Sequence, residues 1–390
     1  MRAMPLDLPA LRRPLLRWYA TAKRDLPWRK TLDPYSILVS ELMLQQTQVK
    51  TALPYYEKFL KRFPTAKALA SATEEQVLAA WAGLGYYRRA RFLHAAAKAV
   101  TAAGAFPGTL EGIRELPGVG AYTAAAVGSI CFNLPAAVVD GNVIRVLARL
   151  LALEADPTKG DGAQAIKDTA QAFLDPNHPG DFNQAIMELG ASLCSPTKPQ
   201  CPACPLKQQC AAFLAHKAED YPKLPERAEG KVLYKAVALA VRGKGAKLQV
   251  LAQPRKVAKG AAKAKAAEAG RAADRLQGFW CFPEVEIAEG SLELAEAAAL
   301  KEARRLLGKQ ADVAGRLAKH RHNITIYDIH LWPFWFRDEG GRDLKGGWEW
   351  VGLAALEKKP LASAEKKLLG LLKDALEPGR EDQGQLGLKI

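Results

Sequence analysis

The sequence predicts two folded parts, an all-α domain followed by a smaller α+β domain. Apolar residues recur every three or four positions through the first 222 residues, which indicates amphipathic helices. A polar, Pro-containing linker follows at 223–231, and from residue 232 the pattern changes to that of strands. The length of 390 residues fits two or three domains.

Eight stretches of helical periodicity make up the predicted first domain, 1–222. They are 36–49, 53–63, 74–82, 87–103, 122–131, 142–152, 162–174 and 182–193. Loops with Pro and Gly separate them. Thr73 and Asp140 precede two of these stretches and are predicted to be N-caps.

The predicted second domain, 232–376, combines strands with one long helix. Strands are expected at 232–242 and 247–253, which pair across a Gly-rich turn, and at 279–287 and 323–336, with a helix at 291–308. The basic insertion 254–275 holds seven Lys or Arg and two acidic residues. It is predicted to be a solvated arm that adds salt-sensitive DNA affinity, or else a surface insertion without a role. The tail 377–390 is predicted to be disordered.

The charge pattern indicates a polyanionic partner. The chain has 56 Lys and Arg against 41 Asp and Glu, a net charge of +15. No stretch approaches 18 uninterrupted apolar residues, so no transmembrane helix and no membrane partner are expected. The N-terminus lacks a secretory cleavage pattern, and its Arg and Leu residues suggest either a packed helix or a transit peptide, of which the helix is favoured.

Four cysteines fall within 17 residues: Cys194, Cys201, Cys204 and Cys210. In a long chain without a secretory signal, such a cluster favours a metal or iron–sulfur site over disulfides. Four thiolates suit either zinc or a [4Fe–4S] cube. The single C-x2-C, together with a first cysteine that ends a helical stretch, favours the iron–sulfur cluster over a zinc ribbon.

Two local patterns suggest contact with a nucleic acid and catalysis. Residues 116–122 read LPGVGAY and lead into a helix. Gly118 and Gly120 in this motif are typical of a hairpin that presents backbone N–H groups to phosphate. The alternative is an ordinary turn between two helices. Asp140 follows an apolar run and precedes a helix. It is expected to be a simple N-cap or a carboxylate kept ionised for chemistry.

Several motifs together resemble the endonuclease III superfamily of DNA glycosylases and, within it, the adenine DNA glycosylase (MutY) family. They are LPGVGAYTA, VVDGNVIRVLAR, the cysteine spacing, SELMLQQTQV from Ser40, LPWR from Leu26 and GLGYY from Gly83. The resemblance covers 10–215 closely and 232–360 loosely. It implies a six-helix barrel module at about 27–134 beside an iron–sulfur module at about 1–26 and 135–215, with one [4Fe–4S] cluster and a catalytic cleft between the modules.

The implied activity is hydrolytic removal of adenine mispaired with 8-oxoguanine, and with guanine, from double-stranded DNA. Glu41 matches the acid that protonates the adenine, for which burial among apolar neighbours would raise its pKa. Asp140 matches the carboxylate that stabilises the oxocarbenium-like sugar. Tyr122 stands where bifunctional relatives have a lysine, which predicts base excision without strand cleavage. Asn142 matches an active-site asparagine.

Further residues match DNA and base contacts of the family. Gln46 and Tyr86 match residues that enter the duplex at the lesion, and Leu44 and Val49 lie beside them in the matching motif; packing within its turn is the alternative for Tyr86. The expected adenine pocket contains Arg24, Trp28, Arg29 and Glu188, with simple core packing as the alternative for Trp28.

The second domain resembles Nudix-like domains through GFWCFPE at 278–284. The helix that should carry acidic metal ligands reads EARRLL from Glu302, so a binding module that reads 8-oxoguanine is expected rather than a hydrolase. His322 and Asn323 align with the lesion-reading loop, whose usual Phe-Ser-His is here His322-Asn323-Ile324. The alternative is that 323–329 is a strand packed through its isoleucines.

Two other functions remain possible from the sequence. A bifunctional glycosylase/lyase is disfavoured by Tyr122, and a non-catalytic lesion-binding protein is disfavoured by the presence of both Glu41 and Asp140. No feature indicates an oligomer, so a monomer is expected, located in a bacterial cytoplasm and associated with the nucleoid through DNA.

Overall fold

The computed structural model describes residues 6–225, 230–255, 278–324, 326–340, 344 and 346–377. Its contacts divide the chain into unit 1, residues 1–72 with 89–227, and unit 2, residues 73–88 with 228–390. Residues 226–229 of the predicted linker, and most of the basic insertion 254–275 and of the tail 377–390, lie outside the described residues, so these three remain predictions.

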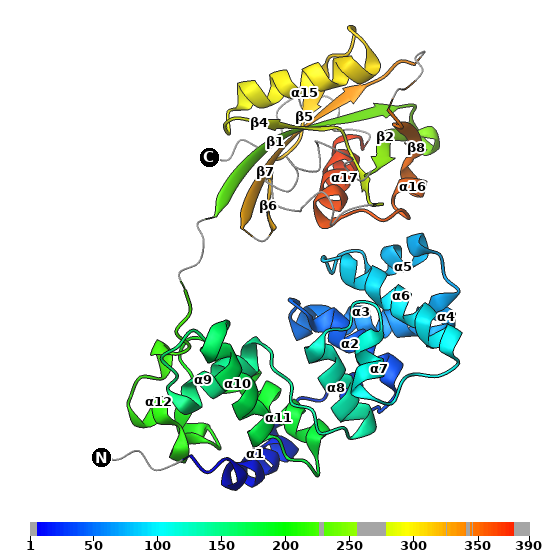
Figure 1. Cartoon of the computed structure of the whole chain (residues 1–390). Helices are drawn as coiled ribbons and strands as arrows, with labels where there is room; N and C mark the ends of the chain where they lie inside the picture. The colour runs from blue at the N-terminus through cyan, green and yellow to red at the C-terminus, as the bar shows by residue number, and fades with distance from the viewer. Residues whose placement is uncertain are drawn as a thin grey trace. The chain divides into compact units, whose positions relative to one another are not determined.

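Unit 1 is helical throughout its described residues (Figure 1). Its α-helices are α1 Leu8–Ala22, α2 Pro34–Leu44, α3 Val49–Arg62, α4 Ala66–Ala70, α6 Arg88–Ala103, α7 Leu110–Glu115, α8 Ala121–Phe132, α9 Gly141–Leu151, α10 Gly160–Phe173, α11 Pro179–Ser192 and α12 Ala211–Leu214. Its 3-10 helices are Pro27–Arg29, Cys201–Ala203, Lys207–Gln209 and Ala218–Asp220. The all-α prediction for this region is confirmed.

Side-chain caps and one apolar core fix these helices. Asp33 caps α2 by accepting from Ser36 N, and Asp140 caps α9 by accepting from Val143 N, so the predicted cap at Asp140 is confirmed. The first turns therefore have partners for backbone donors that a helix leaves open. Leu15 of α1, Leu147 of α9 and Phe182 of α11 lie in one buried cluster, which holds the ends of this unit together.

The predicted helix 36–49 is two helices. α2 ends at Leu44, the chain turns, and α3 begins at Val49. Gln46 takes a left-handed backbone conformation with φ of 56°, which a continuous helix does not allow. The break brings Gln46 and its neighbours to the end of the helix that carries Glu41.

The segment 73–88 groups with unit 2, although the sequence placed it in the first domain. It forms α5, Glu74–Trp81, whose predicted cap Thr73 makes a full capping box with Gln76. Lys359 pairs with Glu75 at 2.9 Å, and the ring of Tyr87 lies 3.8 Å from that of Phe279.

A mixed sheet forms the centre of unit 2. Its strands are β1 Lys231–Arg242, β2 Gln249–Pro254, β3 Trp280–Cys281, β4 Glu284–Ile287, β5 Val313–Arg316, β6 His320–Ile324, β7 Tyr327–Arg337 and β8 Glu349–Gly352. β1 and β7 run parallel over eleven residue pairs in the middle of the sheet. The predicted pairing of the first two strands is confirmed at Val241 with Val250.

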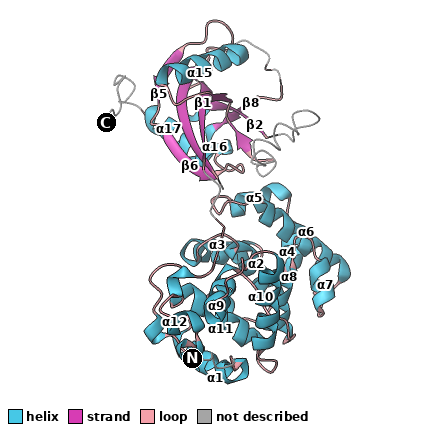
Figure 2. Cartoon of the chain, turned by 60° about the vertical axis from the view of Figure 1, so that its left-hand side comes forward, coloured by secondary structure: helices cyan, strands magenta, loops and turns pink. Residues whose placement is uncertain are grey.

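Helices cover both faces of this sheet (Figure 2). They are α15 Leu292–Leu307 on one face and α16 Leu353–Leu356 and α17 Ser363–Ala375 on the other. Side chains alternate along β1, so Ala236, Ala238 and Ala240 pack under α15 while Val237 and Leu239 pack under α17. The predicted α+β class is thus confirmed. None of the helices in the described ranges is long and apolar enough to cross a membrane.

Candidate active site

A cavity of about 860 Å³ opens in unit 1 and collects most of the predicted site residues of that unit. Helices α2, α8, α9 and α11 and the loops before α2 and α3 line it. The predicted residues at its wall are Arg24, Trp28, Arg29, Glu41, Leu44, Gln46, Val49, Tyr122, Asp140, Asn142 and Glu188. Residues separated by up to 164 positions in the sequence therefore share one space.

Glu41 is a buried carboxyl group at the wall of this cavity. It lies on α2 and is 7% exposed. Burial, with a further contribution from the nearby charge of Asp140, raises its pKa to about 7, while a hydrogen bond with Tyr122 works in the opposite direction. A group with this pKa holds a proton near neutral pH and can donate it, as a general acid must.

Tyr122 lies near Glu41 at the start of α8. Its hydroxyl donates a hydrogen bond to Met187 Sδ at 3.4 Å. Burial, followed by the charges of Glu41 and Asp140, raises the pKa of Tyr122 well above 10. The side chain is therefore a neutral phenol, which is a poor nucleophile.

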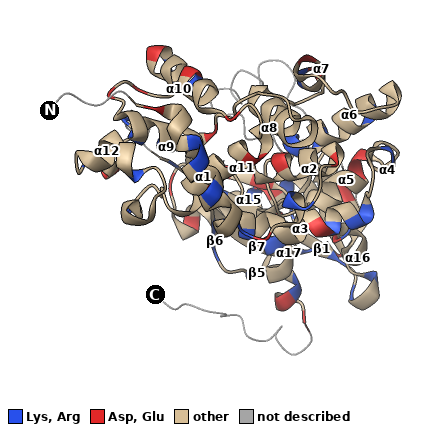
Figure 3. Cartoon of the chain, turned by 90° about the horizontal axis from the view of Figure 1, so that it is seen from below, with Lys and Arg blue, Asp and Glu red and all other residues tan. Residues whose placement is uncertain are grey.

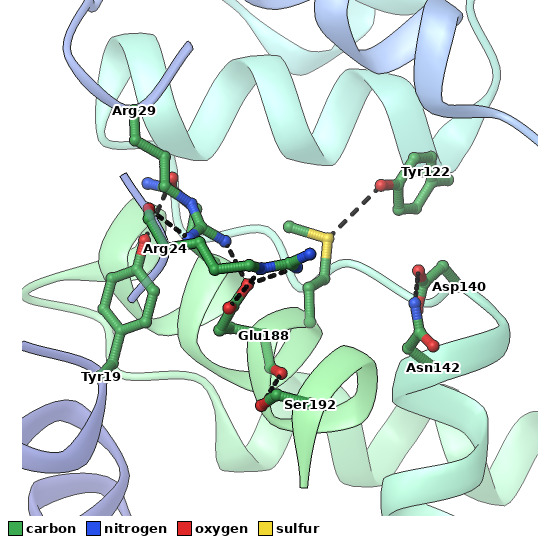
Figure 4. A network of polar contacts seen from close by, with 10 residues as sticks. Tyr19, Arg24, Arg29, Tyr122, Asp140, Asn142, Glu188 and Ser192 are labelled. Atoms are coloured by element: carbon green, nitrogen blue, oxygen red, sulfur yellow. Dashed lines mark hydrogen bonds and ion pairs between the residues drawn. The ribbon is translucent and has the colours of Figure 1, made fainter. Parts of the chain in front are cut away.

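Asp140 is fixed by hydrogen bonds at the N-terminus of α9. It accepts from Val143 N at 2.7 Å and from Asn142 Nδ2 at 3.1 Å (Figure 4). Asn142 Oδ1 accepts in turn from Arg145 at 2.8 Å, and Arg145 also donates to the carbonyls of Gly190 and Cys194, each at 2.8 Å. The carboxylate is thus connected through two side chains to the end of α11.

Three charged residues form a second polar group on the opposite wall. Arg24 makes a two-point contact with Glu188, Nε to Oε1 and Nη2 to Oε2, each at 2.7 Å, and Arg29 reaches Oε2 at 2.6 Å (Figure 4). Burial would raise the pKa of Glu188, but the two arginines outweigh it and the pKa is lowered. Trp28 lies beside them and packs edge-on against Tyr56, so it is both core and cavity wall.

Arg89 supports the end of α2 and was not anticipated from the sequence. This buried side chain donates to the carbonyls of Leu42 and Met43, each at 2.9 Å, and to that of Gln45. These are acceptors that a helix end leaves open, and Arg89 also reaches Thr47 Oγ1. It thereby holds both the helix of Glu41 and the turn of Gln46.

The predicted hairpin lies between α7 and α8. Gly118 has φ of +76°, and a Cβ there would meet Phe92 at 2.2 Å. Gly120 has an ordinary backbone conformation and precedes the first turn of α8, where a Cβ would meet nothing within 4 Å. Position 118 therefore requires glycine, both for its left-handed backbone and for the lack of space for a Cβ. Position 120 has room for a side chain.

The four predicted ligand cysteines gather around the end of α9. Arg149 of α9 lies 3.3 Å from Cys194 Sγ and binds the carbonyls of Ser195 and Pro196. Burial chiefly, with the neighbouring thiols, raises the pKa values of Cys201, Cys204 and Cys210. Within the part of the chain that the structure describes, no group of three or more His, Cys, Asp or Glu converges to hold a single metal ion.

Three predicted residues belong to unit 2. Tyr86 has a left-handed conformation with φ of 47° and is 42% exposed. His322 and Asn323 lie in β6, which forms a hairpin with β7. The alternative of one packed strand over 323–329 is wrong, because the range crosses the turn between β6 and β7 and Ile326 in that turn is 38% exposed, although Ile329 is buried. Asn323 is exposed and His322 is half-buried, and all three residues line a smaller cavity of unit 2.

Several cavity residues and supports escaped the sequence analysis. Met187, Gln184 and Lys50 line the cavity, and Arg89 and Arg145 hold its helices. Spacing on α11 could have found Gln184, because it lies four positions before Glu188 on the same helix face, and Met187 lies three positions after Gln184. No comparable signal marks Arg89.

Basic side chains lie on α1 of the same unit. The helix contains Arg12, Arg13 and Arg17 and no acidic residue (Figure 3). Arg12 binds the carbonyls of Ala172 and Phe173, which leaves Arg13 and Arg17 exposed at the surface. Exposed positive charge is what a polyanion requires.

Comparison with known proteins finds a family and several relatives that are similar to this chain. Residues 39–172 match the model of the HhH-GPD superfamily base excision DNA repair protein. The chain is 49% identical to the adenine DNA glycosylase of Rattus norvegicus and 47% to that of Homo sapiens, each over 217 residues. These matches cover 53% of this chain and 42% and 40% of the relatives.

A further curated relative and one solved structure also match this chain. The adenine DNA glycosylase of Buchnera aphidicola subsp. Acyrthosiphon pisum is 37% identical, over 60% of its length. A thermostable thymine-DNA glycosylase is 29% identical with a TM-score of 0.49, over 53% of this chain and 97% of that one. The chain spans less than two thirds of the curated relatives named here. Residues 39–172 of this chain are thus similar to the HhH-GPD superfamily of base excision DNA repair proteins.

Proposed function

We propose that this chain is a monofunctional adenine DNA glycosylase that excises adenine mispaired with 8-oxoguanine or guanine in double-stranded DNA. The observation that carries the proposal is the pair of unlike carboxyl groups in one cavity. Glu41 is buried with a pKa of about 7, and Asp140 is fixed by two hydrogen bonds at a helix N-terminus. The curated relatives with the adenine glycosylase name add support.

The chemistry follows from the two groups. Adenine leaves a sugar poorly until a ring nitrogen is protonated, and Glu41 would supply that proton. The glycosidic bond then breaks with its electron pair moving to the base, which leaves an oxocarbenium-like sugar. Asp140 would stabilise this cation electrostatically, and water would add to it and lose a proton. The products are adenine and an abasic site.

The adenine must leave the base stack to reach these groups, because the glycosidic bond is inaccessible within a duplex. The Arg24–Arg29–Glu188 cluster and Trp28 would form the pocket for the flipped base. Gln46 and Tyr86 would fill the space left in the duplex, since an amide and a flat ring satisfy base edges and stacked faces. Gly118 and Gly120 would present the hairpin to phosphate.

Tyr122 favours base excision without strand cleavage. A lyase needs an amine that attacks the sugar carbon, and the phenol of Tyr122 remains neutral because its pKa lies well above 10. This argument disfavours the bifunctional alternative.

Cys194, Cys201, Cys204 and Cys210 would hold one [4Fe–4S] cluster. The donor set fits, because it consists of thiols alone and three of them, Cys194, Cys204 and Cys210, pack against the same buried cluster of unit 1. In a [4Fe–4S] cube each cysteine sulfur binds a different iron atom. The four cysteine sulfurs therefore need not converge on one point as they would around a single zinc ion. Bound there, the cluster would cross-link residues 194–210. A visible absorbance band in anaerobically purified protein supports this assignment, and colourless protein with stoichiometric zinc contradicts it.

Unit 2 would read the 8-oxoguanine through His322 and Asn323. The Asn323 amide offers both a donor and an acceptor to a purine edge, and it is exposed on β6. The loss of the usual third residue, replaced by Ile324, does not touch the groups proposed for catalysis.

A single-turnover assay on a duplex with one 8-oxoguanine·adenine pair tests the proposal. We expect adenine release by the wild type, strand scission only after alkali, and no release by Glu41→Gln. Glu57→Gln, an exposed glutamate on α3, is the matched control and should keep wild-type activity. Tight binding to the lesion duplex without release would indicate a lesion-binding protein instead. Scission without alkali would show that another nucleophile performs a lyase step.

A further inference from the structure

The Tyr122 hydroxyl has two acceptors within its reach in the cavity of unit 1. One is Met187 Sδ, to which it donates a hydrogen bond at 3.4 Å (Figure 4). The other is the Glu41 carboxylate, because a hydrogen bond between the Tyr122 and Glu41 side chains contributes to the pKa of each. All three side chains line the same cavity. Tyr122 can therefore bind either neighbour without leaving the site.

Only one of these acceptors can receive the Tyr122 hydrogen at a time, because a phenol has a single O–H. The thioether sulfur of Met187 carries no hydrogen, so Tyr122 must be the donor in that pair. With its hydrogen directed to Met187, the Tyr122 oxygen can accept a hydrogen bond from a protonated Glu41. It cannot then donate to an ionised Glu41. The choice of acceptor is thus linked to the protonation state of Glu41.

This choice affects how firmly Glu41 holds its proton. A hydrogen bond that Tyr122 donates to the Glu41 carboxylate favours the ionised form and lowers the pKa of Glu41. Donation to Met187 removes that hydrogen bond, and the protonated form of Glu41 is then favoured. A sulfur in the place of Met187 Sδ is therefore a competitor of the Glu41 carboxylate for one hydrogen.

We propose that Met187 is a positioning residue, whose sulfur directs the Tyr122 hydrogen away from Glu41 and so keeps Glu41 in the protonated form. Met187 lies on α11, directly before Glu188, and it acts on the acid through Tyr122. The inference rests on the proposed function, because Glu41 is the proposed acid of adenine release.

Other ionisable groups act on Glu41 independently of this exchange. Asp140 of α9 contributes to the raised pKa of Glu41 through its charge. Cys131 of α8 remains a neutral thiol, because burial, above all, raises its pKa to about 12. The charged groups on the other parts of the cavity wall and at the end of α2 are Arg24, Arg29, Lys50 of α3, Glu188 of α11 and Arg89 of α6. The variants below alter none of these groups.

Met187→Leu tests the proposal, because leucine has a similar volume but offers no acceptor. We expect the Tyr122 hydrogen to turn to the Glu41 carboxylate and lower the pKa of Glu41 by about one unit. The falling limb of single-turnover adenine release against pH should then move down by about one pH unit. Release should be about tenfold slower than wild type at pH 8 and nearly unchanged at pH 5.

The matched control is the same change in a Tyr122→Phe background, where no hydroxyl remains to be redirected. Met187→Leu should not shift the pH profile of that variant. Infrared titration of the Glu41 carboxyl band, identified by its loss in Glu41→Gln, measures the pKa of Glu41 without turnover. A lower pKa in Met187→Leu supports the role of Met187 even if no adenine is released, and the proposed function alone then fails.

Three results overturn the role of Met187. They are a pKa of Glu41 that is unchanged or higher in Met187→Leu, an equal shift in the Tyr122→Phe background, and a slower release at every pH without a shift. The last result would show that Met187 only shapes the cavity. Circular dichroism shows whether each variant is folded, and Met187→Ile, which also lacks an acceptor, decides the matter if Met187→Leu is not.

Discussion

At the scale of single residues, the protonation of Glu41 should set the pH dependence of adenine release. Burial raises the pKa of this group to about 7, so it is protonated below that pH and loses its proton above it. A general acid must be protonated, and we therefore expect the single-turnover rate to be flat below pH 7 and to fall about tenfold per pH unit above it. A rate that rises through pH 7 would contradict the role of Glu41.

The same raised pKa predicts a stability effect. Between the ordinary pKa of 4.5 and about 7, the folded protein holds a proton on Glu41 that the unfolded chain has lost. The stability contributed by this site is therefore complete below pH 4.5 and decreases by up to about 3 kcal/mol as the pH rises to 7. Glu41→Gln should thus gain stability relative to wild type from pH 5 to pH 8. Denaturant melts measure the difference, and an unchanged difference would refute it.

Residue identity predicted the residues that line the cavity better than the residues that support them. Glu41, Tyr122, Asp140 and Asn142 were all expected, and the structure brings them to one cavity. Arg89 was not expected, because its function depends on the carbonyls at the end of α2, which sit more than forty residues away in the sequence. A pattern of residue types does not report where unpaired carbonyls lie after folding.

At the scale of elements, the close approach of α11 to α9 should control the active site. A Cβ at Gly190 would lie 2.6 Å from Cβ of Asn142, the residue that binds Asp140. Gly190→Ala should therefore displace Asn142, cost about 1–3 kcal/mol of stability and slow adenine release. Gly370→Ala in α17, where a Cβ meets nothing within 4 Å, should instead add about 0.5–1 kcal/mol. Denaturant melts and single-turnover rates compare the two variants.

The hairpin between α7 and α8 offers a comparison within one turn. Gly118→Ala combines a left-handed backbone with a contact of 2.2 Å to Phe92 and should destabilise by about 2 kcal/mol or more, with weaker duplex binding. Gly120→Ala has neither problem and keeps its N–H, so its stability should stay within about 0.5 kcal/mol of wild type. Equal effects of the two variants on stability would show that the turn is not strained.

Helical periodicity predicted the long helices closely and failed where local backbone geometry intervened. The predicted stretch 87–103 is α6, and 122–131 is α8, within a residue at each end. The stretch 36–49 is broken within the polar run 45–48, where Gln46 takes a left-handed backbone conformation. The break places the Gln46 turn at the wall of the cavity.

At the scale of the whole molecule, the sequence could not predict that residues 73–88 group with unit 2. The segment reads as one more amphipathic helix and lies more than 140 residues before the rest of that unit. The segment is grouped with unit 2 through contacts between residues far apart in the sequence, such as Lys359 with Glu75 and Tyr87 with Phe279. Such pairs become visible only when the fold brings them together.

The last prediction concerns which unit recognises the lesion and which performs the chemistry. If unit 2 reads the lesion and unit 1 performs the chemistry, Asn323→Ala should lower affinity for 8-oxoguanine·adenine duplexes by about 1–3 kcal/mol through the loss of a base-edge contact. Release of adenine from guanine·adenine pairs should remain unchanged, because Asn323 does not line the cavity of Glu41. Asn177→Ala, an exposed asparagine of unit 1, is the matched control. Duplex binding and single-turnover rates on both pairs measure the split, and an equal loss on both pairs would show that Asn323 serves DNA binding in general.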